Sequence, residues 1–107
     1  MKSLKEISLI CAKIRKDSGF FTPSNLDEEL NRDSMLGKLM LVVSEVSEAA
    51  EAVRRNDQEN FKVELADIII RILDITGTLG IDIYPYILKK IEKNKIREFR
   101  HSKKTSL

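Results

Sequence analysis

Two pairs of carboxylates are the residues of this chain that could do chemistry together. Glu45 and Glu48 form one pair, and Glu64 and Asp67 form the other, each with a spacing of i, i+3. On an α-helix this spacing places both side chains of a pair on one face, about one turn apart. Four carboxylates in one place repel one another unless a cation neutralises them. The spacing therefore indicates a site for a hard metal ion.

The segments around both pairs have the apolar pattern of buried helices. Glu45 lies inside the apolar arc of LMLVVSEVSEAAEAV. The segment FKVELADIIIRILDITGTL is apolar nearly all the way round, and most of its polar residues form one narrow stripe. This stripe consists of polar residues at steps of three and four, namely Glu64, Asp67, Arg71, Asp74 and Thr78. Burying these acids without a partner would cost much free energy, which a bound metal would offset. We expect Arg71 and Asp74 to support the acids as their neighbours.

A solvated helix face is the ordinary interpretation of glutamates at helical spacing. Such a face usually pairs each acid with a lysine or arginine four residues later. Here the residues four positions after Glu45, Glu48 and Glu64 are alanine, alanine and isoleucine, and only Asp67 has a basic one, Arg71. We therefore favour the metal site over the solvated face.

The metal that best fits four carboxylates is Mg²⁺, with Mn²⁺ as a substitute. Mg²⁺ prefers oxygen ligands and commonly shares its coordination shell with waters and phosphates. Zinc usually takes histidine or cysteine, and the candidates Cys11 and His101 lie at opposite ends of the sequence. The sequence therefore predicts a magnesium site made of the four acids.

The N-terminal part of the chain is expected to form an amphipathic helix over residues 3–17, because apolar residues recur there at steps of three and four. Gly, Pro, Asn and Asp are frequent in the next segment, which predicts a loop from Gly19 with one or two helical turns at residues 26–30. Phe20 and Phe21 lie in this loop. They could cover a nucleobase or fix the loop on the bundle, and Phe21 is our candidate for substrate binding.

The two acid-bearing helices are expected to be antiparallel neighbours. Asp33 or Ser34 can cap the first of them, which runs to about Arg55, and a short polar turn precedes the second, which begins near Glu59. A short turn places the helix axes side by side, roughly 8 to 10 Å apart. The two pairs of acids can then face each other across one groove.

A last helix is expected between Asp82, as its cap, and about Phe99, after Gly77 loosens the preceding helix and Gly80 ends it. One face of this helix carries polar groups at helical steps, namely Lys90, Lys93, Asn94 and Arg97. Cations of this kind can take up charge on phosphoryl oxygens. A solvated basic face is the ordinary alternative.

Length and composition indicate one small globular domain over residues 1–107, in which a modest core is often supplemented by oligomerisation. A net charge of +2 is too small to indicate a nucleic-acid partner. The sequence has no run of about 18 apolar residues, which a membrane span would need, and the charged N-terminal segment is unlike a signal peptide. We therefore expect a cytoplasmic protein that binds neither nucleic acid nor membrane.

The acid motifs resemble the MazG-like group of all-α nucleoside triphosphate pyrophosphohydrolases. The resemblance rests on SEVSEAAEA, on ELADIIIRILD and on KKIEKNKIREFRH, and it extends from about Lys38 to Lys104. It implies an all-α, four-helix-type bundle, Mg²⁺ on the four acids, and a homodimer or homotetramer with active sites completed near subunit interfaces. It also implies hydrolysis of a nucleoside or deoxynucleoside triphosphate to monophosphate and pyrophosphate, by metal-activated water attacking the α-phosphorus.

Within this interpretation Glu45 and Glu48 are the candidate catalytic residues, because one of them could orient or deprotonate the water. The polar face of the last helix becomes a candidate for substrate binding. Phosphoribosyl-ATP or a modified pyrimidine triphosphate is an alternative substrate. The alternative from another class of protein is a non-catalytic helical module, partner-binding or regulatory, that retains the acidic groove.

Overall fold

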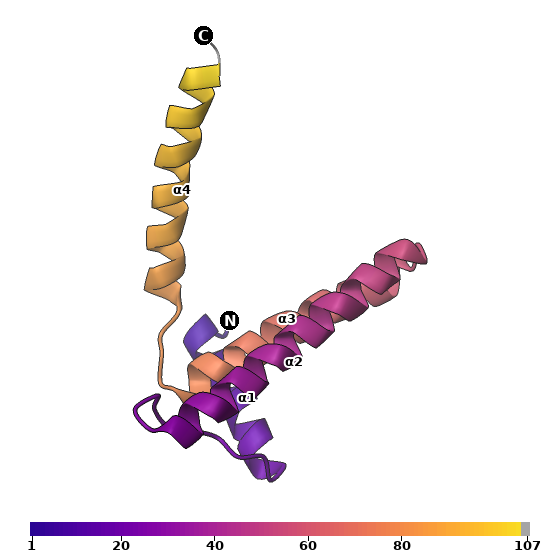
Figure 1. The fold of residues 1–107 in the computed structure, drawn as a ribbon, viewed down its shortest axis with the longest axis vertical. Coiled ribbons are helices and arrows are strands. Elements are labelled where there is room, and N and C mark those ends of the chain that lie inside the picture. The colour runs from indigo at the N-terminus through magenta and orange to yellow at the C-terminus, as the bar shows by residue number, and fades with distance from the viewer. Residues whose placement is uncertain (106–107) are drawn as a thin grey trace.

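The computed structural model describes the backbone of residues 1–105 and the side chains of residues 1–97. The described chain contains four helices and no strand: α1 (Leu4–Asp17), α2 (Glu29–Arg54), α3 (Gln58–Thr78) and α4 (Tyr84–Thr105). Figure 1 shows α2 and α3 as a long pair, with α4 extending away from them. None of the described helices combines the length and apolar content needed to cross a membrane. The expected all-α fold is confirmed.

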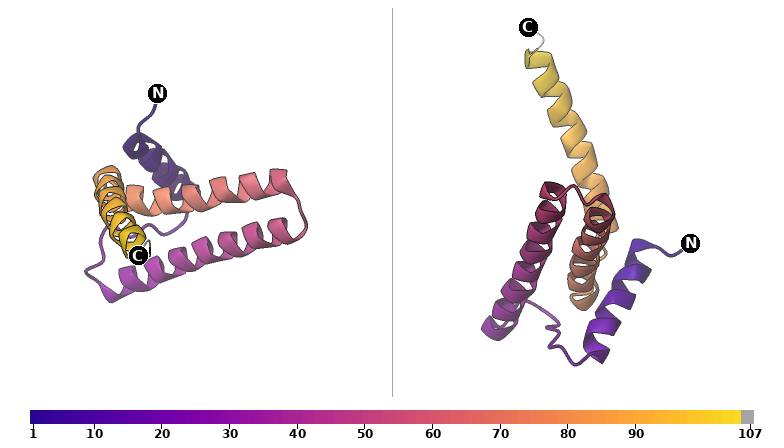
Figure 2. Two further views of the ribbon diagram at one scale, coloured as in Figure 1. Left: turned by 90° about the horizontal axis from the view of Figure 1, so that it is seen from above. Right: turned by 90° about the vertical axis from the view of Figure 1, so that its right-hand side faces the viewer.

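The turn between α2 and α3 is short because Asp57 both closes α2 and caps α3. Asn56 adopts a left-handed conformation with φ 56°, and the Asp57 N–H donates to the Ala52 carbonyl at 2.9 Å, which closes α2. The Asp57 side chain then accepts a hydrogen bond from the Asn60 N–H at 3.1 Å and caps α3. The two helices therefore run antiparallel and side by side (Figure 2).

The start of α2 differs from the expected cap at Asp33 or Ser34. The helix already begins at Glu29, and the residue before it makes no capping hydrogen bond through its side chain. The loop is instead held by Asn25, whose Oδ1 accepts from the Asp27 N–H at 3.0 Å and from the buried Asn31 amide at 3.3 Å. Because these bonds fix the chain ahead of the helix, α2 starts there without a side-chain cap.

Gly77 allows α1 to pack closely against α3. A Cβ atom at Gly77 would lie 2.1 Å from the carbonyl oxygen of Ser8, so any side chain there requires the backbone to move. The buried Ser8 hydroxyl donates to the Leu73 carbonyl at 2.7 Å and also contacts the Thr76 hydroxyl. Gly77 thus lies in the last turn of α3, where we expected it to loosen the helix, and the structure shows in addition that it forms the close contact with α1.

Gly77→Ala is expected to destabilise the fold by about 1 to 3 kcal/mol, because the added methyl group overpacks the contact between α1 and α3. Gly37→Ala is the matched control, since Gly37 also lies in a helix but has no neighbouring atom within 4 Å of an added Cβ. This control should stabilise the helix by roughly 0.5 to 1 kcal/mol. Urea unfolding measures both, and a Gly77→Ala protein as stable as the wild type would contradict the packing.

The core formed within one chain is small for a sequence so rich in apolar residues. Its buried hydrophobic residues are Cys11, Met35, Ala49, Ala52 and Leu73. In contrast, large apolar side chains on α2 and α3 are more than half exposed, among them Leu36, Met40, Val43, Val63 and Ile69. An exposed apolar surface of this extent is typical of a protein–protein contact.

The fourth helix stands apart from the other three. Gly80 adopts a left-handed conformation with φ 67°, and the Ile81 N–H donates to the Thr76 carbonyl at 2.8 Å, which ends α3. As expected, Asp82 accepts from a backbone N–H at the start of α4, that of Tyr84 at 3.4 Å. α1 and α2 both pack against α3, whereas α4 extends away and exposes its side chains over residues 84–97. Within one chain, therefore, three helices pack together.

Candidate metal centre and adjoining pocket

Three of the four predicted acids meet between α2 and α3. Glu45 and Glu48 from α2 and Glu64 from α3 each offer a carboxylate oxygen, and these oxygens all lie within 4.8 Å of one another. The antiparallel hairpin is what brings them together across the groove. Asp67, about one turn further along α3, lies outside this closest group but lines the same pocket as Glu45.

Glu64 is the buried member of the group, with 8% of its surface exposed. Its Oε2 atom has no hydrogen-bond partner within the described residues. The pKa of Glu64 is raised to about 7, first by its hydrogen bond with Glu45, then by burial and by the negative charges of the neighbouring acids. A buried carboxylate among other carboxylates requires either a proton or a cation. The residues present therefore fit a hard cation.

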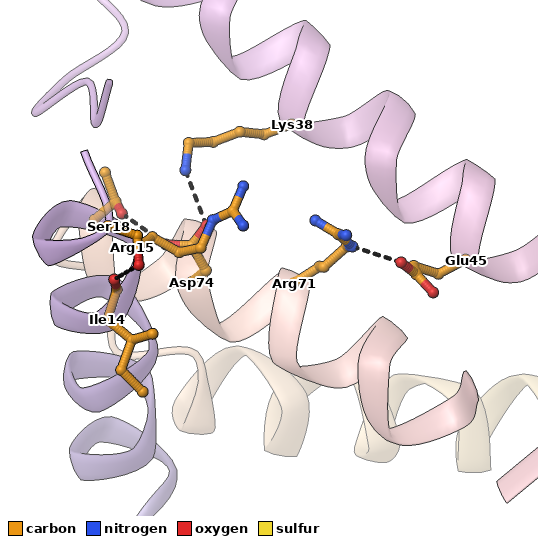
Figure 3. A network of polar contacts seen from close by, with 8 residues as sticks. Ile14, Arg15, Ser18, Lys38, Glu45, Arg71 and Asp74 are labelled. Atoms are coloured by element: carbon orange, nitrogen blue, oxygen red, sulfur yellow. Dashed lines mark hydrogen bonds and ion pairs between the residues drawn. The ribbon is translucent and has the colours of Figure 1, made fainter. Parts of the chain in front are cut away.

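Arg71 controls the charge of Glu45. Its Nε donates to the Glu45 Oε1 at 2.9 Å, across from α3 to α2 (Figure 3). This hydrogen bond, together with the one from Glu64, holds the pKa of Glu45 below its usual value of 4.5. The pKa values of the two glutamates are thus moved in opposite directions, so Glu45 stays ionised while Glu64 can hold a proton. Arg71 thus links α3 to α2 through its ion pair with Glu45.

Asp74 joins all three packed helices at the other end of this polar region. It is buried, and the Lys38 Nζ from α2 donates to its Oδ2 at 2.9 Å. The Arg15 Nε from α1 lies 3.8 Å from the same oxygen, and the Thr78 hydroxyl donates to Oδ1 at 3.3 Å. Figure 3 shows the side chains of Lys38, from α2, and Arg15, from α1, both extending toward Asp74. Asp74 therefore fixes the elements that position the acids.

The sequence analysis missed Lys38 and Arg15. Lys38 could have been found, because it lies seven residues before Glu45 and so shares its helix face. No spacing indicates Arg15, because its position depends on how α1 packs against α3. The structure thus adds two cations to a region that the sequence described mainly by its acids.

A pocket of about 200 Å³ lies beside the acids. Its lining residues come from α1, α2 and α3, and they are Arg15, Glu45, Asp67, Ile70, Arg71 and Asp74. Carboxylates and guanidinium groups therefore share one small space. Such a mixture suits a ligand that combines a metal ion with anionic oxygens.

The other candidates do not meet the acids within one chain. Those on α4, namely Lys90, Lys93, Asn94 and Arg97, are exposed on a helix that does not pack against α2 or α3. Phe21 is 56% exposed in the loop before α2. Its neighbour Phe20 lies against the Arg15 guanidinium, with 3.9 Å between the Cζ and the ring centroid. Neither ring is buried in the bundle, whereas Pro23 is. The side chain of His101 lies outside the described residues.

Fold and site together define an all-α protein with a carboxylate metal-site candidate between two antiparallel helices. Residues 34–101, more than half of the chain, match the MazG nucleotide pyrophosphohydrolase domain, and the chain therefore belongs to this family. The matched span contains all four acids and the candidate residues of α4. The resemblance seen in the sequence motifs is thus confirmed. No curated protein and no solved structure gives a significant match.

Proposed function

We propose that this protein hydrolyses a nucleoside triphosphate to the monophosphate and pyrophosphate, with Mg²⁺ held by Glu45, Glu48, Glu64 and Asp67. The observation that supports the proposal most strongly is the buried carboxylate of Glu64 within a group of three acids, because its Oε2 has no hydrogen-bond partner among the described residues. These acids lie inside the span that matches the pyrophosphohydrolase domain. A non-catalytic module would gain nothing from this burial, which costs free energy.

The acids have different roles in this proposal. Mg²⁺, or Mn²⁺ in its place, would neutralise charge on phosphate oxygens and ease the deprotonation of water. The ion pair with Arg71 commits one oxygen of Glu45, whereas Glu48 is exposed. Glu48 is therefore the better candidate for orienting the attacking water and accepting its proton.

Incubation with a panel of nucleoside and deoxynucleoside triphosphates and Mg²⁺ tests this function. The panel includes phosphoribosyl-ATP and modified pyrimidine triphosphates, and chromatography separates the products. We expect equal amounts of monophosphate and pyrophosphate from the preferred substrate, and no reaction after chelation of the metal. No turnover of any nucleotide would favour the non-catalytic module, and release of a nucleoside diphosphate would contradict attack at the α-phosphorus.

We also propose a homodimer or homotetramer in which α4 of one copy lies beside the acids of another. The exposed apolar surface of α2 and α3 supports this assembly, as does an exposed apolar stripe on α4 formed by Tyr84, Ile87, Leu88 and Ile91. In such an assembly the basic face of α4, with Lys93 and Arg97, would approach the triphosphate from the neighbouring copy. Phe21 would contribute to the base-binding side of the same site.

Mixing two inactive variants tests the shared site. Glu64→Gln removes an acid, and Arg97→Ala removes a phosphate-binding group while leaving the acids intact. If acids and α4 come from different copies, a co-refolded mixture should regain about a quarter of the wild-type activity, because half of randomly formed dimers are mixed and each has one intact site. Sedimentation provides the control: a 12.3 kDa species with full activity, or a dimer that regains nothing, would contradict the shared site.

A further inference from the structure

Arg15 differs from the other cations around the pocket because its donors are unused. Arg71 donates to Glu45 and Lys38 donates to Asp74, whereas no hydrogen bond of the described residues involves the Arg15 guanidinium. Its buried Nε lies 3.8 Å from Asp74, which is too long for a hydrogen bond. Lys38 already neutralises Asp74 at 2.9 Å. Arg15 thus forms only a long ion pair with Asp74, and its N–H groups are available to a ligand.

The position of Arg15 is fixed before any ligand arrives. Its guanidinium lies against the ring of Phe20, and its side chain is only 27% exposed. The helix that carries it is held against α3 by the contacts of Ser8 and Gly77. A guanidinium placed in advance loses little side-chain entropy on binding, and its planar donors match two oxygens of a phosphate.

The pocket is long enough to separate two parts of one ligand. Asp67 and Asp74 are two turns apart on α3, roughly 10 Å along the helix. Figure 3 shows the Arg15 guanidinium beside Asp74, on the same side of α3 from which Arg71 extends toward Glu45. An extended anion could therefore have one end at the acids and the other at Arg15.

We propose that Arg15 binds the terminal phosphates of the triphosphate, which leave together as pyrophosphate. This inference rests on the proposed function. In the reaction a water oxygen forms a bond to the α-phosphorus, and the water proton passes to a carboxylate. The bond between the α-phosphorus and the bridging oxygen breaks, and its electron pair leaves with the pyrophosphate. Arg15 neutralises the charge that develops on this leaving group.

Calorimetric titration with inorganic pyrophosphate in the presence of Mg²⁺ tests the proposal without requiring turnover. Arg15→Gln is expected to raise the Kd for pyrophosphate roughly tenfold or more, because it removes charge-assisted hydrogen bonds. The Kd for a nucleoside monophosphate, which lacks the terminal phosphates, should stay unchanged. Lys13→Gln is the matched control, since Lys13 lies on the same helix with its side chain 75% exposed, and both affinities should equal those of the wild type.

The outcomes separate this inference from the proposed function. Unchanged pyrophosphate affinity in Arg15→Gln, with an active wild type, overturns the role of Arg15 and leaves the hydrolysis standing. A wild type that neither binds pyrophosphate nor hydrolyses any triphosphate overturns both. Should Arg15→Gln not fold, Arg15→Lys keeps the charge near Asp74 and loses the paired donors, so the Kd should still rise about threefold. Wild-type affinity in Arg15→Lys would then overturn the inference.

Discussion

Glu64→Gln is expected to lower hydrolysis at least about 100-fold while making the metal-free fold more stable at neutral pH. The amide has nearly the shape of the carboxyl group and carries no charge, so it cannot ligate Mg²⁺ as a carboxylate does. The pKa of Glu64 is raised to about 7 by its hydrogen bond with Glu45, by burial and by the neighbouring negative charges, and the uncharged amide removes the last two of these costs. Stability and activity should therefore move in opposite directions.

The pH dependence of the metal-free protein follows from the sign of the same pKa shift. Folding raises the pKa of Glu64 from 4.5 to about 7, so the folded state holds this proton more tightly than the unfolded state does. The stabilisation is fully present below pH 4.5 and is lost as the pH rises through about 7. Glu64→Gln should lack this loss, which thermal melting at several pH values measures.

Adding Mg²⁺ should reverse the order of stability. A metal that binds only the folded state stabilises it by about 2.7 kcal/mol when its free concentration is 100 times the Kd. The wild type should gain this stability, whereas Glu48→Gln, Glu64→Gln and Asp67→Asn should gain little and be inactive. Glu51→Gln is the control, because Glu51 lies on the same helix as Glu48 and forms an exposed ion pair with Arg54. Equal metal-induced shifts in the wild type and the three variants would show that the acids are not the metal site.

Lys38→Met is expected to destabilise the fold by up to about 3 kcal/mol, because it leaves the buried Asp74 without its closest cation. The value lies at the lower end for buried ion pairs, since Arg15 remains nearby. Asp74→Asn in the same chain removes the stranded charge, so the double variant should recover much of the loss. The methionine retains the apolar stem of the lysine and limits the effect to the charge.

The control for Lys38 is Lys62→Met, which breaks an exposed ion pair with Glu59 on α3. Exposed pairs contribute at most about 1 kcal/mol, so this variant should unfold close to the wild type. Urea unfolding of the metal-free proteins provides the comparison. If Lys38→Met and Lys62→Met were equally stable, Asp74 would not depend on Lys38, and the polar network would not fix the three helices.

The acid cluster could be predicted from the sequence because it depends on local geometry. The i, i+3 spacing places Glu45 with Glu48 on one face of α2. The short turn after α2 makes α3 antiparallel to it, which brings Glu64 close to this pair. The partner of Arg71 could not be predicted in this way. Spacing suggests Asp67, four residues earlier on the same helix, whereas the rotation of α3 against α2 directs Arg71 to Glu45.

Features that depend on contacts distant in sequence were missed or misplaced. A glycine at position 77 is typical of a helix end, but here it is needed because the Ser8 backbone of α1 lies too close for a side chain. The start of α2 depends on side-chain hydrogen bonds of Asn25, which no capping pattern reveals. Likewise, the spacing on α4 shows which residues share a face, but it does not show which helix, neighbouring copy or ligand that face contacts.

Hydrolysis of the preferred triphosphate in water labelled with oxygen-18 tests the central claim most directly. Attack of water at the α-phosphorus predicts one labelled oxygen in the monophosphate and none in the pyrophosphate, with the reaction requiring Mg²⁺ and being lost in Glu64→Gln. Label in the pyrophosphate, or label in the monophosphate at an undiminished rate in Glu64→Gln, would contradict the account.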